Sequence, residues 1–392
     1  MTWSATIRLN GYSRIDWVRE YKLLTYVPIL RAKDGEFDAL RHMHDRVARS
    51  VMPLLDVQKQ PPQTSKKPKS LQDYLSDVAG KLADAHNDRP LFVDMFTFGP
   101  ADKVESGEHV YTYFCGELHA HGMNFHAVVG MDRWSNSEYR AAIGHVLAMN
   151  GGKALLRLET EDLEDMSDPT MFDDMLGDVL DECGLVAKNL PVLIDLGDIR
   201  NLPIADLLPD VSSALEFLRI RGFVQVVIAG SSMPTSINEA VKKHNSAAFL
   251  QRGEMILWKT LLPSTPGVRV VFGDYGVRSP RSSDAMSPDT NGKIRYTVGN
   301  EFFIVRGHSM RIGPKGGQMW ALAHFIVTSP QYAKEGFSWG DEMIKQCSEH
   351  KIKGSSTQWI AFDTSHHLAS VVAEIYEYAR TITGISALNQ PA

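Results

Sequence analysis

The stretch VVFGDYGVRSP, residues 270–280, leads an apolar run directly into Gly-Asp-Tyr-Gly and then into arginine and proline. With Val268 and Arg269 it has the pattern of a β-strand that is covered on both faces and ends in polar side chains. Seven other apolar runs of this kind precede it, with helical patterns between them. These runs are YVPILR (26–31), VMPLLDV (51–57), PLFVDMF (90–96), FHAVVGM (125–131), ALLRLE (154–159), PVLIDLG (191–197) and FVQVVIAG (223–230).

The order of these segments predicts the fold. Apolar residues recur at helical spacing in residues 71–82, after the second run, and in residues 211–218, after the sixth. An eighth helix is predicted at about residues 316–328, behind two glycines. Eight strand–helix units in succession are typical of an α/β fold of the (β/α)8, TIM-like barrel type.

An open, doubly wound parallel sheet is the alternative fold. No GxGxxG sequence follows any of the runs, so the dinucleotide-binding fingerprint of that class is absent. Pro28 and Pro53 fall inside the first two predicted strands, where proline removes a hydrogen-bond donor. Each proline is therefore expected at a strand start or at a bulge.

The chain has more residues than eight strand–helix units require. We assign the barrel to residues 26–330, an N-terminal extension to residues 1–25 and a C-terminal extension, packed on the barrel, to residues 331–392. The C-terminal extension contains a helix predicted to begin at about residue 365. Residues 59–70 form a loop rich in proline, lysine and serine after the second strand.

A second insertion, residues 278–315, separates the eighth strand from its helix. Its segments IRYTV (294–298) and FFIVRG (302–307) are joined by Gly-Asn-Glu at residues 299–301, which predicts a β-hairpin. We expect this hairpin to cover the barrel mouth, with the Tyr275 ring projecting beside it.

The composition is that of a globular protein, with 43% hydrophobic and 22% charged residues among 392. The net charge of -6 disfavours nucleic acid and anionic membranes as partners. The three cysteines lie far apart and form no CxxC pair, which favours a reducing compartment. Residues 1–25 lack the apolar core of a signal peptide, so a cytoplasmic location without membrane contact is expected.

Charged residues follow the predicted strands at the ends that form the mouth of such a barrel. Parallel strands bring their carboxyl ends to one rim, so we expect these side chains to meet there and to form a catalytic site. For any single aspartate, a capping or loop-locking role is the alternative. The predicted catalytic residues are Asp94, Arg157, Asp195 and Asp274. Further charges at strand ends are Arg31, Lys33, Asp56, Asp132, Glu159 and Asp198.

Ligand contacts are predicted on the same rim. The seventh strand ends in AGSSMPTS (229–236), a turn of small residues that leads into a helix, and loops at this place often bind phosphate in barrels. A plain capped turn is the alternative. A small phosphorylated ligand would suit the predicted ligand-binding residues. They are Arg31, Lys33, Gly230, Ser231, Ser232 and Tyr275.

Standard catalytic motifs are absent: the sequence has no GxSxG elbow, Walker A loop, HExxH or CxxC pair. Carboxylates without nearby histidines would suit Mg²⁺ or Mn²⁺ if a metal binds, but the sequence does not identify a metal. His366 and His367 are adjacent on a predicted helix and point about 100° apart, which favours packing or capping over shared metal binding. The sequence leaves open whether the protein is an enzyme.

Six stretches carry a resemblance to a known family. They are YVPILRAKDGEFDAL (26–40), FGDYGVRSP (272–280), IRYT (294–297), the Arg-Gly of FIVRG (303–307), FSWGD (337–341) and HHL (366–368). Together they resemble the beta protein family of satellite phages and prophages, from about residue 26 to residue 380. The resemblance implies a protein encoded beside the Gop toxin in a prophage anti-phage cassette, which restrains that toxin until infection. It implies no catalytic residue.

Three functions remain in competition. The first is a component of a prophage-encoded anti-phage defence system that restrains a partner toxin and senses a ligand in the barrel mouth. The alternative is a metal-assisted phosphodiesterase or nucleotide hydrolase, with aspartates on the metal and Arg157 on phosphate. The third is nucleic-acid binding through Lys66, Lys67 and Lys69, which the negative net charge disfavours.

Overall fold

The computed structural model describes residues 24–62, 68–86, 89–265, 267–282, 290–313 and 316–383. The expected N-terminal extension, up to residue 23, lies outside the described residues. Lys66 and Lys67 of the basic loop lie outside them as well.

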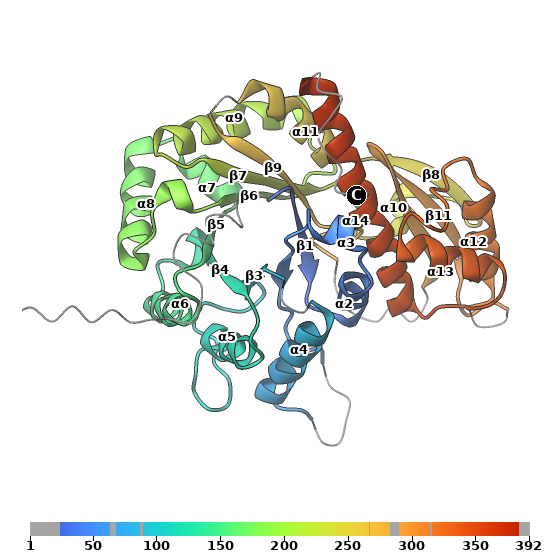
Figure 1. Ribbon diagram of the computed structural model, residues 1–392, viewed down its shortest axis with the longest axis horizontal. Helices are drawn as coiled ribbons and strands as arrows, with labels where there is room; N and C mark the ends of the chain where they lie inside the picture. Colours follow the sequence, from blue (N-terminus) through green and yellow to red (C-terminus); the bar gives the residue numbers. More distant parts are fainter. Residues whose placement is uncertain are drawn as a thin grey trace, which may run out of the picture.

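Eight parallel strands form a closed barrel in the order β1-β2-β3-β4-β5-β6-β7-β9 (Figure 1). Each strand coincides with a predicted run to within a few residues, so the (β/α)8 prediction is confirmed and the open sheet is wrong. Pro53 immediately precedes β2, whereas Pro28 lies within β1. The strands are β1 (Tyr26–Arg31), β2 (Leu54–Asp56), β3 (Leu91–Asp94), β4 (Phe125–Gly130), β5 (Ala154–Leu158), β6 (Val192–Asp198), β7 (Gln225–Ser231) and β9 (Arg269–Asp274).

Helices surround this barrel as a ring (Figure 1). Local sequence sets their ends: the Ser70 hydroxyl accepts a hydrogen bond from the Asp73 amide at the start of α4, and Gly151 ends α6 in the left-handed conformation. Among the described residues, no helix has both the length and the apolar character needed to cross a membrane. The ring contains α2 (Asp34–Arg41), α4 (Leu71–Ala85), α5 (Val110–Ala120), α6 (Ser137–Asn150), α8 (Pro169–Cys183), α9 (Ile204–Ile220), α11 (Gly253–Leu261) and α14 (Ser356–Thr383).

The eighth helix of the ring is not the one predicted. A helix does form at the predicted place, α12 (Gln318–Thr328), but it packs with α13 (Trp339–Ser348) on a second sheet. The position between α11 and α2 belongs to α14, which starts before the predicted residue 365. Both helices carry an apolar face, and chain order alone does not tell which surface each face will cover.

The second sheet is antiparallel and has the order β10-β11-β8. The predicted hairpin is confirmed as β10 (Asn291–Val298) and β11 (Glu301–Ser309). Sequence reasoning missed β8 (Ser246–Gln251), which pairs with β11 and comes from the connection between β7 and α11. Figure 1 shows the sheet outside the ring of helices, so the expectation that the hairpin covers the barrel mouth is wrong. Pairing with β8 keeps the hairpin beside the barrel.

Side-chain alternation along the strands divides the apolar core into two parts. One set of residues fills the barrel interior, and their neighbours along each strand pack under the helices. This division decides which polar side chains at the strand ends enter the mouth. The interior set includes Val27, Ile29, Leu54, Phe92, Val128, Leu155, Leu193, Val227 and Val271.

Candidate functional site

The same alternation carries five polar side chains into the mouth of the barrel. Each lies two or four residues beyond an interior residue of its strand, and adjacent positions face the helices instead. The inward group is Asp56 on β2, Asp94 on β3, Arg157 on β5, Asp195 on β6 and Tyr275 just beyond β9.

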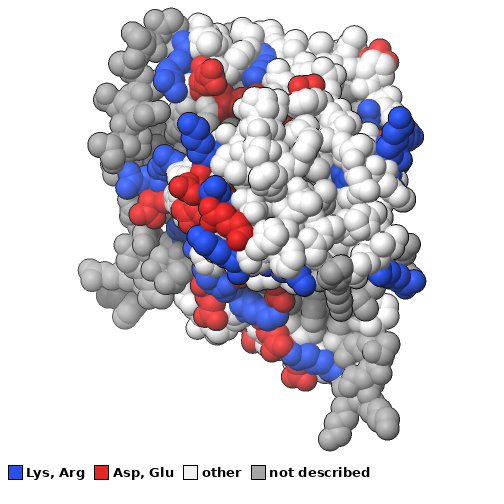
Figure 2. Space-filling view, turned by 90° about the vertical axis from the view of Figure 1, so that its right-hand side faces the viewer, with Lys and Arg blue, Asp and Glu red and all other residues white. Residues whose placement is uncertain are grey.

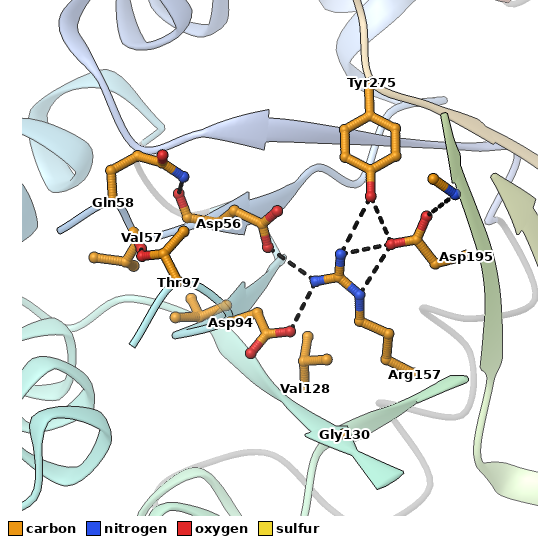
Figure 3. Close-up of polar contacts among 12 residues, drawn as sticks. Asp56, Val57, Gln58, Asp94, Thr97, Val128, Gly130, Arg157, Asp195 and Tyr275 are labelled. Atoms are coloured by element: carbon orange, nitrogen blue, oxygen red, sulfur yellow. Dashed lines mark hydrogen bonds and ion pairs between the residues drawn. The ribbon is translucent and has the colours of Figure 1, made fainter. Parts of the chain in front are cut away.

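Arg157 lies at the centre of this group and is 1% exposed (Figure 3). Its Nη1 donates to Asp56 Oδ1 at 3.0 Å and to Asp94 Oδ2 at 2.9 Å. Its Nε and Nη2 donate to Asp195 Oδ2 at 3.1 and 2.5 Å, and Nη2 also lies 3.4 Å from Tyr275 Oη. A guanidinium group has five N–H donors, and these five contacts occupy all of them.

The backbone after Asp195 binds the carboxylate oxygen that does not contact Arg157. Asp195 Oδ1 accepts a hydrogen bond from the Gly197 amide at 3.0 Å, while Tyr275 Oη donates to Oδ2 at 2.6 Å. Gly197 has a φ of 59°, a left-handed conformation that favours glycine, and the β6–β7 register shifts between Asp195 and Asp198. The bulge therefore turns the backbone amide back onto the carboxylate.

Arg133 completes the cluster, and sequence reasoning missed it. Its Nη1 and Nη2 donate to Asp94 Oδ1 and Oδ2 at 2.8 and 3.2 Å, a two-pronged ion pair. Gly130 permits this geometry, because a Cβ there would collide with the Arg133 guanidinium. The sequence carried a signal for Arg133. Buried carboxylates need positive charges beside them, and Arg133 follows the fourth strand by only three residues. We call Asp56, Asp94, Arg133, Arg157, Asp195 and Tyr275 the Arg157 network.

Burial and charge balance set the protonation of the Arg157 network. Burial raises the pKa of Asp56 to about 6, against the opposing effect of Arg157. Burial also favours the neutral form of Asp94, but Arg133 and Arg157 outweigh it and hold the Asp94 pKa below its usual range. Burial and the neighbouring Asp195 raise the Tyr275 pKa well above its usual value, so Tyr275 stays a hydrogen-bond donor. The network thus has two guanidinium groups against three carboxylates, and Asp56 is more readily protonated than Asp94.

Asp274, predicted to be part of this site, lies on the other face of its strand. It is one residue away from the inward-facing Tyr275 and points between the barrel and α14. There Asp274 accepts a hydrogen bond from Tyr26 Oη at 2.6 Å and lies 2.8 Å from His367 Nε2 and 3.4 Å from Arg252 Nη2. The structure therefore brings Asp94, Arg157 and Asp195 together and leaves Asp274 in a separate buried cluster.

The predicted anion site at residues 230–232 already holds a carboxylate of the chain itself. Glu254 Oε2 accepts from the Ser232 amide at 3.0 Å and from the Ser232 hydroxyl at 2.7 Å. The Ser231 hydroxyl accepts a hydrogen bond from the Met233 amide at 3.2 Å, and Gly230 faces Ile199. These groups lie where a phosphate was expected, but Glu254 occupies the donors of Ser232.

The remaining predicted ligand contacts also have partners within the chain. Arg31 donates to the Ser282 carbonyl oxygen and to the Ser282 hydroxyl, the latter at 2.8 Å. Lys33 is half-buried at the start of α2. Tyr275 points into the mouth toward Arg157 and Asp195 (Figure 3) instead of projecting beside the hairpin.

A divalent metal has no suitable position in this arrangement. The guanidinium of Arg157 lies between the three carboxylates, where a bridging cation would have to lie. Within the described parts of the chain, no group of three or more His, Cys, Asp or Glu side chains could hold a metal ion. His366 contacts Asp341 on α13 and the Thr297 carbonyl oxygen on β10, and His367 contacts Asp274 on β9, so these histidines link α14 to α13, to the second sheet and to the barrel.

Fold and site together define an α/β barrel whose mouth is closed by an internal ion-pair network and which carries a second, antiparallel sheet. The chain belongs to the Beta protein family, whose model matches residues 26–373. A comparison with curated proteins finds no match.

Proposed function

We propose that this member of the Beta protein family is a component of a prophage-encoded anti-phage defence system and restrains a partner toxin. The proposed toxin is Gop-like and comes from a neighbouring gene. The resemblance in the motifs around FGDYGV and FSWGD supports this role, because it implies such a partner.

The barrel mouth favours a binding protein over a hydrolase. Each N–H of Arg157 is already directed at a side chain of the protein, so none remains for a phosphate. A hydrolase of the proposed type needs a metal between its carboxylates, and Arg157 lies there instead. We therefore regard the Arg157 network as a rigid support for the rim.

A row of aromatic side chains on the second sheet is the observation that carries the proposal. Phe249 on β8 stacks on Phe303 on β11 with ring centroids 4.8 Å apart, and Phe325 on α12 lies 6.0 Å from Phe303. Phe249 is 47% exposed and Phe325 49%. Figure 2 shows a broad area without charged side chains on the side of the molecule where α12 and the sheet lie. Exposed aromatic rings side by side on a surface without charged groups are typical of protein–protein contacts, and we assign the aromatic row to the toxin.

Co-expression with the neighbouring toxin gene tests this assignment. Phe325→Glu and Phe249→Thr each remove an exposed ring and leave the buried Phe303 in place. Because aromatic anchors dominate interface energies, each variant should bind toxin about tenfold or more weakly and fail to protect growth. Ile220→Glu, a change of the same kind at a 72% exposed helix position, is the matched control.

Binding is measured by co-purification and titration, and folded protein by thermal unfolding. Loss of protection in both aromatic variants, at normal folded levels and with Ile220→Glu unaffected, supports the proposal. Full protection by both aromatic variants would remove the aromatic row as the toxin site. Failure of the wild-type chain itself to bind or restrain the toxin would refute the function.

A further inference from the structure

A cavity of about 220 Å³ lies between the barrel rim and the second sheet. Its walls come from segments that are distant in sequence: residues 233–237 after β7, residues 277–282 after β9, residues 290–295 at the beginning of β10, Met310 after β11, Met319 on α12, and residues 354–360 at the beginning of α14. We call it the rim cavity. It is separate from the Arg157 network, none of whose side chains lines it.

The charges in the rim cavity are all positive. Arg278, Lys293 and Arg295 line it, and the described residues of its wall include no carboxylate. Two of these cations are paired behind the wall: Arg295 Nε lies 2.9 Å from Asp363 and Arg278 Nη1 lies 3.3 Å from Glu36. The Lys293 ammonium group makes no hydrogen bond or ion pair with any described residue.

The environment of Lys293 is unfavourable for an isolated ammonium group. Burial, with a further contribution from Arg295, lowers the pKa of Lys293 to about 8, against the opposing effect of Asp363. An anion beside the ammonium group would offset this cost, as ion pairing does for buried charges in general. Among the described residues, no carboxylate forms an ion pair with the Lys293 ammonium group.

The rest of the wall is largely apolar. Met233, Met319, Trp359 and Ile360 line the cavity. Polar uncharged residues of the wall are Thr235, Ser279, Ser282, Thr290, Asn291 and Ser356. An engineered protein cavity of about 150 Å³ takes a benzene molecule, so the rim cavity has room for a somewhat larger ring or chain. Apolar walls with a few directed polar groups are typical of small-molecule sites.

We propose that the rim cavity binds a small organic anion, whose phosphate or carboxylate pairs with Lys293 and whose apolar body lies against Met319 and Trp359. This site replaces the turn at residues 230–232 as the anion site of the rim. It lies apart from the aromatic row, and the proposal does not depend on a toxin partner.

Calorimetric titration with four probes tests the site on the full chain. Phenyl phosphate and benzoate share a ring and differ in the anion, benzyl alcohol is the neutral counterpart, and inorganic phosphate is the anion alone. We expect at least one of the two aromatic anions to bind at millimolar concentration, and their relative affinity distinguishes a phosphate ligand from a carboxylate ligand. Benzyl alcohol and inorganic phosphate should bind about tenfold or more weakly. Benzyl alcohol lacks the negative charge that pairs with Lys293, and inorganic phosphate lacks the ring that packs on the apolar wall.

Lys293→Met keeps the aliphatic stem and removes the charge, and it should weaken binding of the aromatic anion about tenfold or more. Lys243→Met, at an exposed position, should leave the affinity unchanged. Mild acetylation followed by peptide mass spectrometry gives a second readout in the wild type, where the bound anion should slow modification of Lys293 and not of Lys243.

Three results would overturn the proposal: no binding of either aromatic anion, equal binding of benzyl alcohol, or undiminished binding to a folded Lys293→Met variant. If inorganic phosphate binds as tightly as phenyl phosphate, the apolar half of the proposed ligand is wrong.

Discussion

At the scale of single residues, Arg157 holds the mouth of the barrel together. It contacts side chains from β2, β3 and β6 and the tyrosine after β9, so one guanidinium joins strands from opposite sides of the barrel. The Phe96 ring lies 4.1 Å from the guanidinium carbon and adds a cation–π contact. Asp56 and Asp195 depend on Arg157, because a buried carboxylate without a counter-charge is costly, whereas Asp94 also pairs with Arg133.

Arg157→Met therefore should destabilise the protein strongly. The change keeps much of the volume and leaves Asp56 and Asp195 without their main cation, so we expect a loss of about 3–5 kcal/mol in the free energy of unfolding at pH 7. Urea unfolding followed by circular dichroism measures it. Lys81→Met removes the exposed Lys81–Asp34 pair as a control and should cost less than about 1 kcal/mol. Equal effects of the two substitutions would show that the Arg157 network does not stabilise the mouth.

At the scale of elements, α14 has two roles. Its apolar residues Leu368, Val371, Val372 and Ile375 close the ring of helices. Its polar residues connect the ring to the second sheet and to α13: His366 Nε2 lies 2.9 Å from the Thr297 carbonyl oxygen of β10, and His366 Nδ1 lies 3.0 Å from Asp341 in the first turn of α13. A helix from the far end of the chain therefore completes a barrel that begins near residue 26.

Deletion of α14 tests this role. Burying four such apolar side chains contributes about 6–12 kcal/mol, which is comparable with the whole stability of a typical domain. A chain ending at Ser355 should therefore show no cooperative thermal transition, whereas a chain ending at Thr383 should unfold like the full chain. Calorimetry and gel filtration distinguish the two. A cooperative transition in the shorter chain would mean that the barrel is complete without α14.

At the scale of the whole molecule, buried ion pairs join the barrel, the second sheet and α14. Arg252 is the main junction: its Nη1 lies 2.9 Å from Glu374 on α14 and donates to the Gly299 carbonyl of the hairpin at 2.9 Å, and its Nη2 reaches Asp274 on β9. Thr297 and His367 add a second connection, with Thr297 Oγ1 2.7 Å from His367 Nδ1. We infer that barrel and sheet unfold together.

Hydrogen exchange tests this coupling. The slowest amides of β5 and β10 should report the same free energy of opening in the wild type. In Arg252→Met the free energy of opening of the β10 amides should be at least about 2 kcal/mol lower than that of the β5 amides, because the ion pairs of Arg252 are lost. Arg221→Met, which removes an exposed pair with Asp173, should leave both unchanged. Different opening energies in the wild type would refute the coupling.

The sequence predicted three residues of the barrel-mouth site. It did not predict which other side chains join them and which lie elsewhere. Strand ends identified Asp94, Arg157 and Asp195 as neighbours, because parallel strands end at one rim. The alternation of side chains along a strand would also have placed Asp274 and Tyr275 on opposite faces of the strand, because adjacent residues of a strand point to opposite sides. The partnership of Glu254 with Ser232 had no local signal, because the two lie on different elements and meet only after folding.

The sequence by itself determined the eight barrel strands, the hairpin and most of the helices, because the spacing of apolar residues is a local property that sets the type of each element. Only the tertiary structure decided that α14 and not α12 closes the ring, that β8 joins the hairpin, and that Arg157 neutralises carboxylates from three strands. The physical reason is that apolar faces and buried charges accept any complementary partner. Which partner they meet depends on barrel closure, which brings together residues far apart in the chain.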